Sequence, residues 1–246
     1  MRAPDGAVSW WGTPGSEQGR FNFGIGGNVA VSPDGSLIAV GEEGNHRIQL
    51  FDRSRNYIAS YGRLGDGPGQ LKFPSVTIDA QNRIWVVDGF RRDVQQFTVD
   101  GWVQTFANEG EHQPADPAMS SFREDTGELY VPDFERKHIS VWNEDGTWVR
   151  DYESRPEEGL RFSGINKVHV DDAGRMFVVD TTNRIFVLDP DGHLIGTIPS
   201  VLPDGIGPVD LPGFALDRQG RLYYADAHHR RLIVLQLLPP IWPPPG

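Results

Sequence analysis

The chain of 246 residues contains no cysteine. Disulfide bonds, zinc sites with thiolate ligands and cysteine nucleophiles are therefore excluded. No apolar run approaches the roughly 20 residues that a membrane-spanning helix needs, so no transmembrane segment is expected. The first residues, MRAPDGAVSWWG, lack the apolar core of a signal peptide, and no signal peptide is expected in this chain.

Basic residues are in the minority, with 23 Lys and Arg against 34 Asp and Glu and a formal net charge of −11. Nonspecific binding to nucleic acid or anionic lipid depends on cationic surface, so a nucleic-acid partner is not expected. The chain also lacks the HExxH zinc motif, the GxSxG elbow, the P-loop and the dinucleotide glycine fingerprint. The enzyme classes that depend on these motifs are excluded.

Internal repetition is the strongest positive signal. Five similar segments follow one another at intervals of 45 to 47 residues, and they begin at Asn28, Ser75, Ser120, Asn166 and Gly213. In the first segment, strands are expected at 29–31, 37–40, 48–51 and 57–61, separated by turns rich in Asp, Asn and Gly. Four short strands in a repeat of this length are typical of one β-propeller blade. The sequence therefore predicts an all-β fold, a single propeller domain of five four-stranded antiparallel blades over residues 1–246.

The fifth segment lacks a fourth strand, because Leu238 runs into the proline-rich tail 239–246 and proline does not continue a central ladder. Residues 8–11 followed by Gly12 are similar to the fourth strand and glycine of 57–62. We expect residues 8–11 to pair with the strand at 232–235, to complete the last blade and to hide an open edge. The tail is expected to be polyproline II that docks on a partner or on its own blade.

The turn and loop sequences of the repeats resemble those of the NHL-repeat propellers, especially the bacterial proteins described as six-bladed. The similarity is carried by Gly44–Ile48, by the loop Gly65–Gln70 and by the pairs that end second strands, which are Val87-Asp88, Val179-Asp180 and Ala225-Asp226. Because that family usually has six blades, this chain is either a five-bladed member or a chain from which one blade is missing. The resemblance also favours a location outside the cytoplasm.

The turns between second and third strands are rich in arginine. One arginine per blade (Arg47, Arg92, Arg184 and Arg231) is expected to brace the turn by pairing with, or lying beside, the acid that ends the second strand. The remaining arginines, Arg91, Arg136 and Arg230, are the candidates for binding an anionic group, together with His46 and His229 from the same turns. An alternative is a zinc site formed by His46, His138 and His229. Such a site requires the three side chains to meet at one point. The three histidines, however, stand at different positions relative to the third strands of their repeats.

A second candidate site lies where first strands begin. In lactonase-type propellers, Asn, Asp and Glu at this place hold calcium, and the corresponding candidates are Asn28, Asn166 and Asp210. The expectation is a chain with no cofactor, with calcium at this place as the alternative. His169, on a first strand, is expected to be a hydrogen-bonded structural histidine.

Two functions remain open. The first is a non-catalytic scaffold that binds a protein or peptide through the loop-rich side, where the long connections between blades are found. The alternative is a metal-dependent hydrolase or lyase, with calcium or zinc, acting at the mouth of the central channel. No feature of the sequence sets the oligomeric state.

Overall fold

A computed structural model describes residues 11–24, 26–107, 109–182, 184–198, 214–217, 219–226 and 231–237. This part of the chain is β structure, apart from one short 3₁₀ helix, η1 (Pro156–Glu158). No helix within it is long and apolar enough to cross a membrane. The chain divides into two compact units, residues 1–108 and 109–246. The single domain expected from the repeats stays a prediction.

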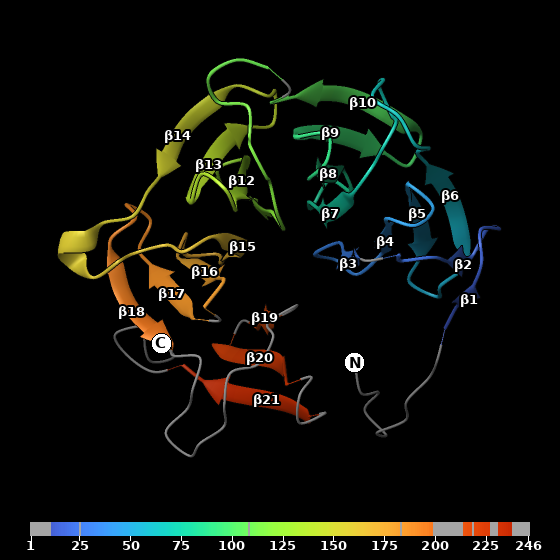
Figure 1. The fold of residues 1–246 in the computed structure, drawn as a ribbon. Helices are drawn as coiled ribbons and strands as arrows, with labels where there is room; N and C mark the ends of the chain where they lie inside the picture. Colours follow the sequence, from blue (N-terminus) through green and yellow to red (C-terminus); the bar gives the residue numbers. More distant parts are fainter. Residues whose placement is uncertain are drawn as a thin grey trace. The chain divides into compact units, whose positions relative to one another are not determined.

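Unit 1 contains two four-stranded antiparallel sheets, which follow a short parallel pair of strands, β1 (Thr13–Pro14) and β2 (Arg20–Phe21). The strands of the first sheet are β3 (Gly27–Val31), β4 (Leu37–Glu42), β5 (Arg47–Asp52) and β6 (Tyr57–Tyr61). Those of the second sheet are β7 (Pro74–Ile78), β8 (Ile84–Asp88), β9 (Asp93–Thr98) and β10 (Gly101–Phe106). The first strands of the two sheets, β3 and β7, lie side by side (Figure 1).

Unit 2 contains three further sheets. The third sheet has β11 (Ser121–Arg123), β12 (Glu128–Asp133), β13 (His138–Asn143) and β14 (Trp148–Tyr152). The fourth has β15 (Ile165–Val170), β16 (Met176–Asp180), β17 (Ile185–Leu188) and β18 (Leu194–Ile198). The fifth has three strands in the described residues: β19 (Phe214–Leu216), β20 (Arg221–Asp226) and β21 (Arg231–Gln236).

The fold is all-β, a five-bladed propeller of mainly four-stranded antiparallel sheets, as the repeats predicted. Apolar side chains from neighbouring sheets pack against each other, so that Ile48 and Leu50 of the first sheet share one core with Val76 and Ile84 of the second. Every residue of β8 is buried, whereas the fourth strand β10 is largely exposed or half-buried. Burial of second strands on both faces explains why their sequences are continuously apolar.

The strand expected to complete the last blade lies largely outside the described residues. Of residues 8–11 only Trp11 is described, and its ring packs edge-to-face on Phe51 at 4.6 Å and on Phe21 at 5.3 Å. The fifth sheet shows no fourth strand of its own within the described residues, as expected from the proline-rich tail. The pairing of residues 8–11 with residues 232–235 stays a prediction, and the tail 239–246 is not described.

A β-bulge in β15 changes the register that the sequence suggested for the fourth blade. Asn28 of β3 pairs with Gly41, one residue before the acid that ends β4. The residue of β15 in the equivalent position, opposite Val179, is Lys167, because the register shifts between Ile165 and Lys167. Lys167, and not Asn166, is therefore the counterpart of Asn28. Counting from the start of each repeat did not reveal this, because a bulge adds one residue without changing the strand pattern.

Candidate functional site

In the second blade, the acid that ends the second strand organises the turn that follows. The side chain of Asp88 is fully buried. It accepts hydrogen bonds from four backbone N–H groups: those of Lys72 (2.6 Å), Phe73 (3.0 Å), Phe90 (3.2 Å) and Arg91 (3.0 Å). Two of these groups belong to the β8–β9 turn and two to the connection that precedes β7. One carboxylate therefore fixes both loops on this side of the sheet.

The arginines of these turns follow the expected pairing in two blades. Arg47 forms an ion pair with Glu42 at 2.5 Å, and Arg184 forms one with Asp180 at 2.9 Å. In the second blade the roles differ from the expectation. Arg91 makes the ion pair, with Asp93 at 2.5 Å, whereas Arg92 is exposed and has a positive φ of 61°. This left-handed backbone at Arg92 changes the direction in which its side chain leaves the turn.

The five residues predicted to bind a ligand are placed as follows. Arg91 is almost buried, since 6% of its side chain is exposed, and it also donates a hydrogen bond to the carbonyl oxygen of Gly65. Arg136 donates to the carbonyl oxygen of Glu111 at 3.0 Å, and Nδ1 of His46 lies 3.0 Å from the carbonyl oxygen of Lys72. These contacts give each of them a structural role. Arg230 and His229 lie outside the described residues, and ligand binding by the five residues stays a prediction.

The predicted calcium ligands are also partly described. Asn28 uses both polar atoms of its side chain within unit 1: Nδ2 donates to the carbonyl oxygen of Val76, and Oδ1 accepts from the backbone N–H of Val76, both at 2.8 Å. Asn166 begins the bulge in unit 2, and Asp210 lies outside the described residues. Among the residues that the structure describes, no three His, Asp or Glu side chains are grouped to hold a metal ion. The calcium site stays a prediction.

Lys167 connects the fourth and fifth blades within unit 2. Its Nζ donates a hydrogen bond to the carbonyl oxygen of Phe214 at 2.8 Å and lies 4.7 Å from the centre of the Phe214 ring. The carbonyl group of Phe214 on β19 corresponds to that of Val76 on β7, because each residue pairs with the position two before the acid that ends the second strand. Lys167 thus donates a hydrogen bond to the next blade at the same place as Asn28 does, but its donor is a charged ammonium group that also lies over an aromatic ring.

Burial changes the proton equilibria of two side chains on this strand. Desolvation lowers the pKa of Lys167 from 10.5 to about 8. Desolvation and the nearby Lys167 charge lower the pKa of His169 to about 4. The imidazole of His169 is therefore neutral at neutral pH. Among the described residues no hydrogen bond to its imidazole is found, and the hydrogen-bonded structural role expected for this histidine stays a prediction.

The contact of Lys167 leads to a prediction on pH and stability. Because the folded chain releases this proton near pH 8 and an unfolded chain near pH 10.5, the free energy of unfolding is expected to rise with pH between these values, by up to about 1 kcal/mol per pH unit. Lys167→Met should remove this rise. Lys167→Gln should also remove it, while its amide continues to donate to the carbonyl oxygen of Phe214. Urea unfolding at pH 7, 8, 9 and 10 measures both effects, and equal slopes in all three proteins would contradict the assignment.

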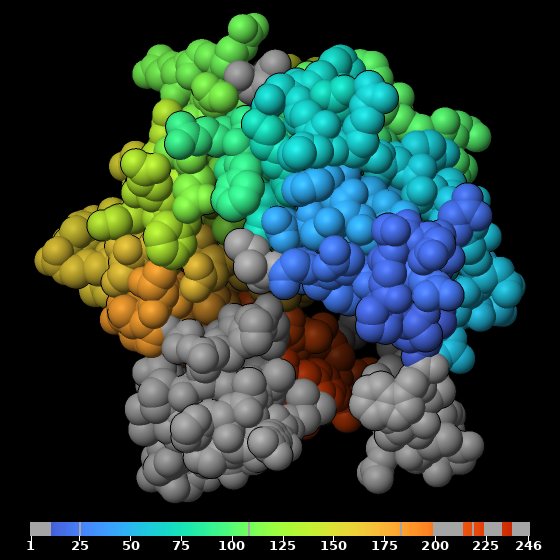
Figure 2. Space-filling model, turned by 45° about the vertical axis from the view of Figure 1, so that its right-hand side comes forward, coloured from blue at the N-terminus to red at the C-terminus, as the bar shows by residue number. Residues whose placement is uncertain are grey.

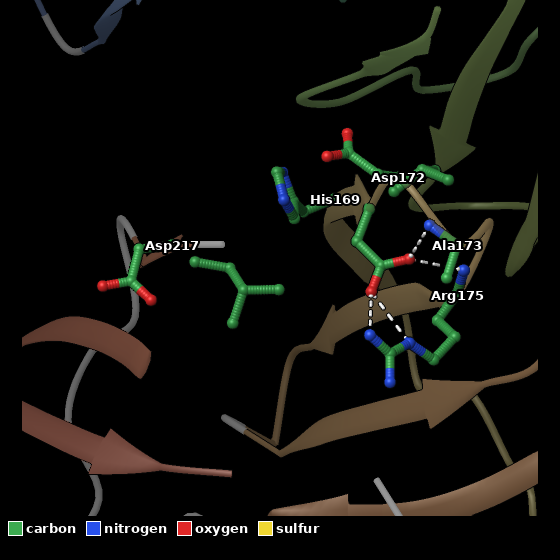
Figure 3. Close-up of a pocket in the computed structure, with 8 residues that line it drawn as sticks. His169, Asp172, Ala173, Arg175 and Asp217 are labelled. Atoms are coloured by element: carbon green, nitrogen blue, oxygen red, sulfur yellow. Dashed lines mark hydrogen bonds and ion pairs between the residues drawn. The ribbon is translucent and has the colours of Figure 1, made fainter. Parts of the chain in front are cut away.

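A cavity of about 330 Å³ opens next to His169 in unit 2. Its lining comes from the end of β15, the β15–β16 turn, and the end of β19 with the residue after it, and consists of His169, Val170, Asp171, Asp172, Ala173, Arg175, Leu216 and Asp217. In the view of Figure 3 the imidazole stands between the carboxylates of Asp172 and Asp217. This side of the sheets is opposite to the one that carries the turns between second and third strands.

The loop side of unit 1 carries aromatic residues that the sequence analysis did not single out. Phe90 in the β8–β9 turn is 59% exposed, and its ring lies 5.0 Å from that of Phe73. A side chain on Gly26 would come within 2.5 Å of the Phe73 ring, and one on Gly27 within 2.5 Å of the ring of Phe23. Phe23, Phe73 and Phe90 thus all lie in loops on this side of the two blades, and we refer to them as the loop-side phenylalanines.

A signal for these residues is present in the sequence, because a phenylalanine within a polar turn is unusual. The same feature recurs in unit 2, where Phe134 follows the strand-ending Asp133 and is 39% exposed. Leu64, in the connection that leads to β7, is 62% exposed. In Figure 2 the first blade and the residues before it, in blue, form one continuous surface with the connection and the start of the second blade, in cyan.

Comparison with known proteins places the chain among propellers. The human and mouse proteins named NHL repeat-containing protein 3 are each 28% identical to it over 142 residues, which make up 53% of this chain and 39% of the relative. The match thus spans about two fifths of the length of these relatives. No family model matches the chain.

Solved structures share the fold at low sequence identity. A catalytically inactive virginiamycin B lyase from Staphylococcus aureus, crystallised with quinupristin, superposes with a TM-score of 0.60 and 13% identity, over 86% of this chain and 70% of that one. A protein of unknown function from Bacteroides caccae gives a TM-score of 0.59 and 13% identity, over 85% of this chain and 76% of that one. At this identity the superpositions show a common fold.

Proposed function

We propose that this chain, which is a distant homologue of NHL repeat-containing protein 3, is a non-catalytic binding module that holds a protein or peptide on the loop side of its blades. The observation that carries the proposal is the row of loop-side phenylalanines in unit 1. Phe23 and Phe90 are 43% and 59% exposed, and Phe73 is half-buried beside Phe90. Exposed aromatic side chains are characteristic of protein interaction sites, where a few such residues supply most of the binding free energy.

The position of these residues supports recognition. Phe90 and Phe73 each donate a backbone N–H to the buried carboxylate of Asp88, so that the two rings are held by one anchor. Ordering a loop on binding costs conformational entropy, and a loop that is already fixed avoids this cost. The loop side therefore presents its apolar groups in a geometry that is set before a partner arrives.

The chemistry of the surroundings favours one kind of partner. Hydrophobic rings would take apolar side chains of the partner, and the acidic excess of the chain, with a net charge of −11, would favour a segment that also carries Lys or Arg. Asp66, exposed in the connection before β7, lies on the same side of the blade, where it forms an ion pair with Lys72 at 2.5 Å. We infer that the partner is a protein segment with exposed apolar residues flanked by basic ones.

Selection of peptides from a displayed library, followed by measurement of Kd, tests this function. Phe90→Ser is expected to weaken the binding of the selected peptides by at least about tenfold, because truncation of an aromatic anchor typically costs about 2 kcal/mol or more and about 1.4 kcal/mol corresponds to a factor of ten. Val99→Ser is the matched control, since Val99 is 41% exposed in the β9–β10 turn on the opposite side of the same sheet. Unchanged affinity in Phe90→Ser, or equal losses in both variants, would contradict the proposal.

A further inference from the structure

The cavity beside His169 lies on the side opposite to the loop side, and one residue distinguishes it from the equivalent places in the other blades. His169 of β15 pairs with Phe177, which lies three residues before the acid that ends β16. The residues at the corresponding register of the other first strands are small: Ala30 in β3, Thr77 in β7, Ser121 in β11 and Ala215 in β19. Among the described strands, only the fourth blade places a polar ring here. The repeated fold therefore does not require a ring at this register.

The imidazole of His169 forms part of the cavity wall (Figure 3). Its ring centre lies 6.1 Å from that of Phe214, in an edge-to-face arrangement, and 6.5 Å from that of Phe177. A neutral imidazole carries one N–H donor and one acceptor nitrogen, and in the part of the chain that the structure describes no hydrogen bond to either nitrogen is found. Because polar groups withdrawn from bulk water are usually hydrogen-bonded, a ligand that pairs with the imidazole would be favoured in this cavity.

The formal charges around the cavity cancel, since three cations accompany the three carboxylates of the lining, which are Asp171, Asp172 and Asp217. Asp171 forms an ion pair with Arg175 at 2.6 Å. Asp217 forms one with Arg221 at 2.6 Å, and both of its oxygens accept hydrogen bonds within the protein. Lys167 supplies the third positive charge, which acts on the nearby imidazole. An ion would enter a cavity that offers no net opposite charge, so the surroundings favour an uncharged ligand.

The remaining lining is apolar and comes from Val170, Ala173 and Leu216. A volume of about 330 Å³ falls at the lower end of the range typical of small-molecule sites. A hydroxyl group both donates and accepts hydrogen bonds, so it can pair with either nitrogen of a neutral imidazole, whichever one carries the proton. We propose that this cavity binds a small uncharged alcohol, whose hydroxyl group pairs with His169 and whose apolar body contacts Leu216 and Val170.

Three probes with the same ring and different charge test the ligand class: benzyl alcohol, benzylammonium and benzoate. NMR titration at pH 7 follows the backbone amide signals of Val170, Ala173 and Leu216, which line the cavity. Benzyl alcohol is expected to shift these signals saturably, with a Kd in the millimolar range or below. Both ions should bind at least about fivefold more weakly, because each loses hydration without meeting a net opposite charge. Either ion binding as tightly as benzyl alcohol, or the absence of saturation by benzyl alcohol up to about 10 mM, would overturn the proposal.

Two variants of His169 test the assigned residue with benzyl alcohol. His169→Phe keeps a ring and removes both nitrogens, so the Kd is expected to rise at least about fivefold because the hydroxyl group loses its partner. His169→Ala should fold, since alanine occupies this register in β3 and β19, and should also bind more weakly. Thr77→Ala is the matched control at the same register of β7 and should bind as the parent does. Unaltered binding in both His169 variants, or an equal loss in Thr77→Ala, would refute the site.

Discussion

Replacement of Arg91 by methionine is expected to lower the free energy of unfolding by about 3–5 kcal/mol, the usual cost of removing one partner from a buried ion pair. Arg91 and Asp93 have 6% and 2% of their side chains exposed, and Nε and Nη2 of Arg91 contact the carboxylate of Asp93 at 2.5 to 3.3 Å. Without the guanidinium, the carboxylate stays buried and lacks its counter-charge. Urea unfolding at pH 7, monitored by tryptophan fluorescence, measures the loss.

The pH dependence of this loss distinguishes a lost charge pair from lost packing. Desolvation raises the pKa of the Asp93 carboxyl, while Arg91 lowers it. For an acid whose folded pKa is raised, the folded state is favoured when pH falls below the folded pKa and is disfavoured as pH rises through it. Removal of Arg91 should raise this pKa further. The deficit of Arg91→Met should therefore be smaller at pH 4.5 than at pH 7.

A double variant provides the control. Arg91→Met combined with Asp93→Asn removes both charges, and it should recover a large part of the stability lost in Arg91→Met alone. The same experiment bears on the expectation that Arg91 binds an anionic ligand. Full stability in Arg91→Met at pH 7 would show that the guanidinium is not required for the fold, and would favour a role in ligand binding.

Replacement of Asp88 by alanine is expected to have an effect of similar size, about 3–5 kcal/mol, because four backbone N–H groups lose their acceptor at a position with no exposed surface. Asp88→Asn should cost less, since Oδ1 serves three of these four donors and an amide keeps one oxygen. Thermal unfolding monitored by circular dichroism gives both values.

The matched control for Asp88 is Asp145→Ala. Asp145 accepts one backbone N–H, that of Thr147, in an exposed turn, so its loss is expected to cost about 1 kcal/mol or less. Peptide binding adds a second measurement, because Asp88 holds Phe73 and Phe90. In conditions where Asp88→Asn stays folded, its affinity for the selected peptides should fall although no loop-side phenylalanine has changed. Equal stability losses in Asp88→Ala and Asp145→Ala would contradict the assigned role.

Asp88 and Arg91 show what local sequence patterns could predict and what they could not. The acid at the end of each second strand was identified from its place in the repeat, and Asp88 and Asp180 are buried at the ends of β8 and β16 as expected. In the second blade Arg92 lies beside Asp88, with its backbone N–H donating to the Asp88 carbonyl oxygen at 2.7 Å, whereas the ion pair is formed by Arg91 and Asp93. Two neighbouring residues of the same type give no local signal as to which one forms an ion pair.

The sequence by itself determined the fold class, the number of repeats and the position of most strands, because these follow from short-range properties: alternating apolar residues, turn residues and a regular spacing. The tertiary structure alone decided the features that depend on residues far apart in the chain. A bulge placed Lys167 at the register of Asn28, and the cavity arose where residues 169–175 meet residues 216–217. The row of loop-side phenylalanines likewise joins residues 23, 73 and 90. Contacts between distant residues depend on how neighbouring blades pack, which a repeat pattern encodes only on average.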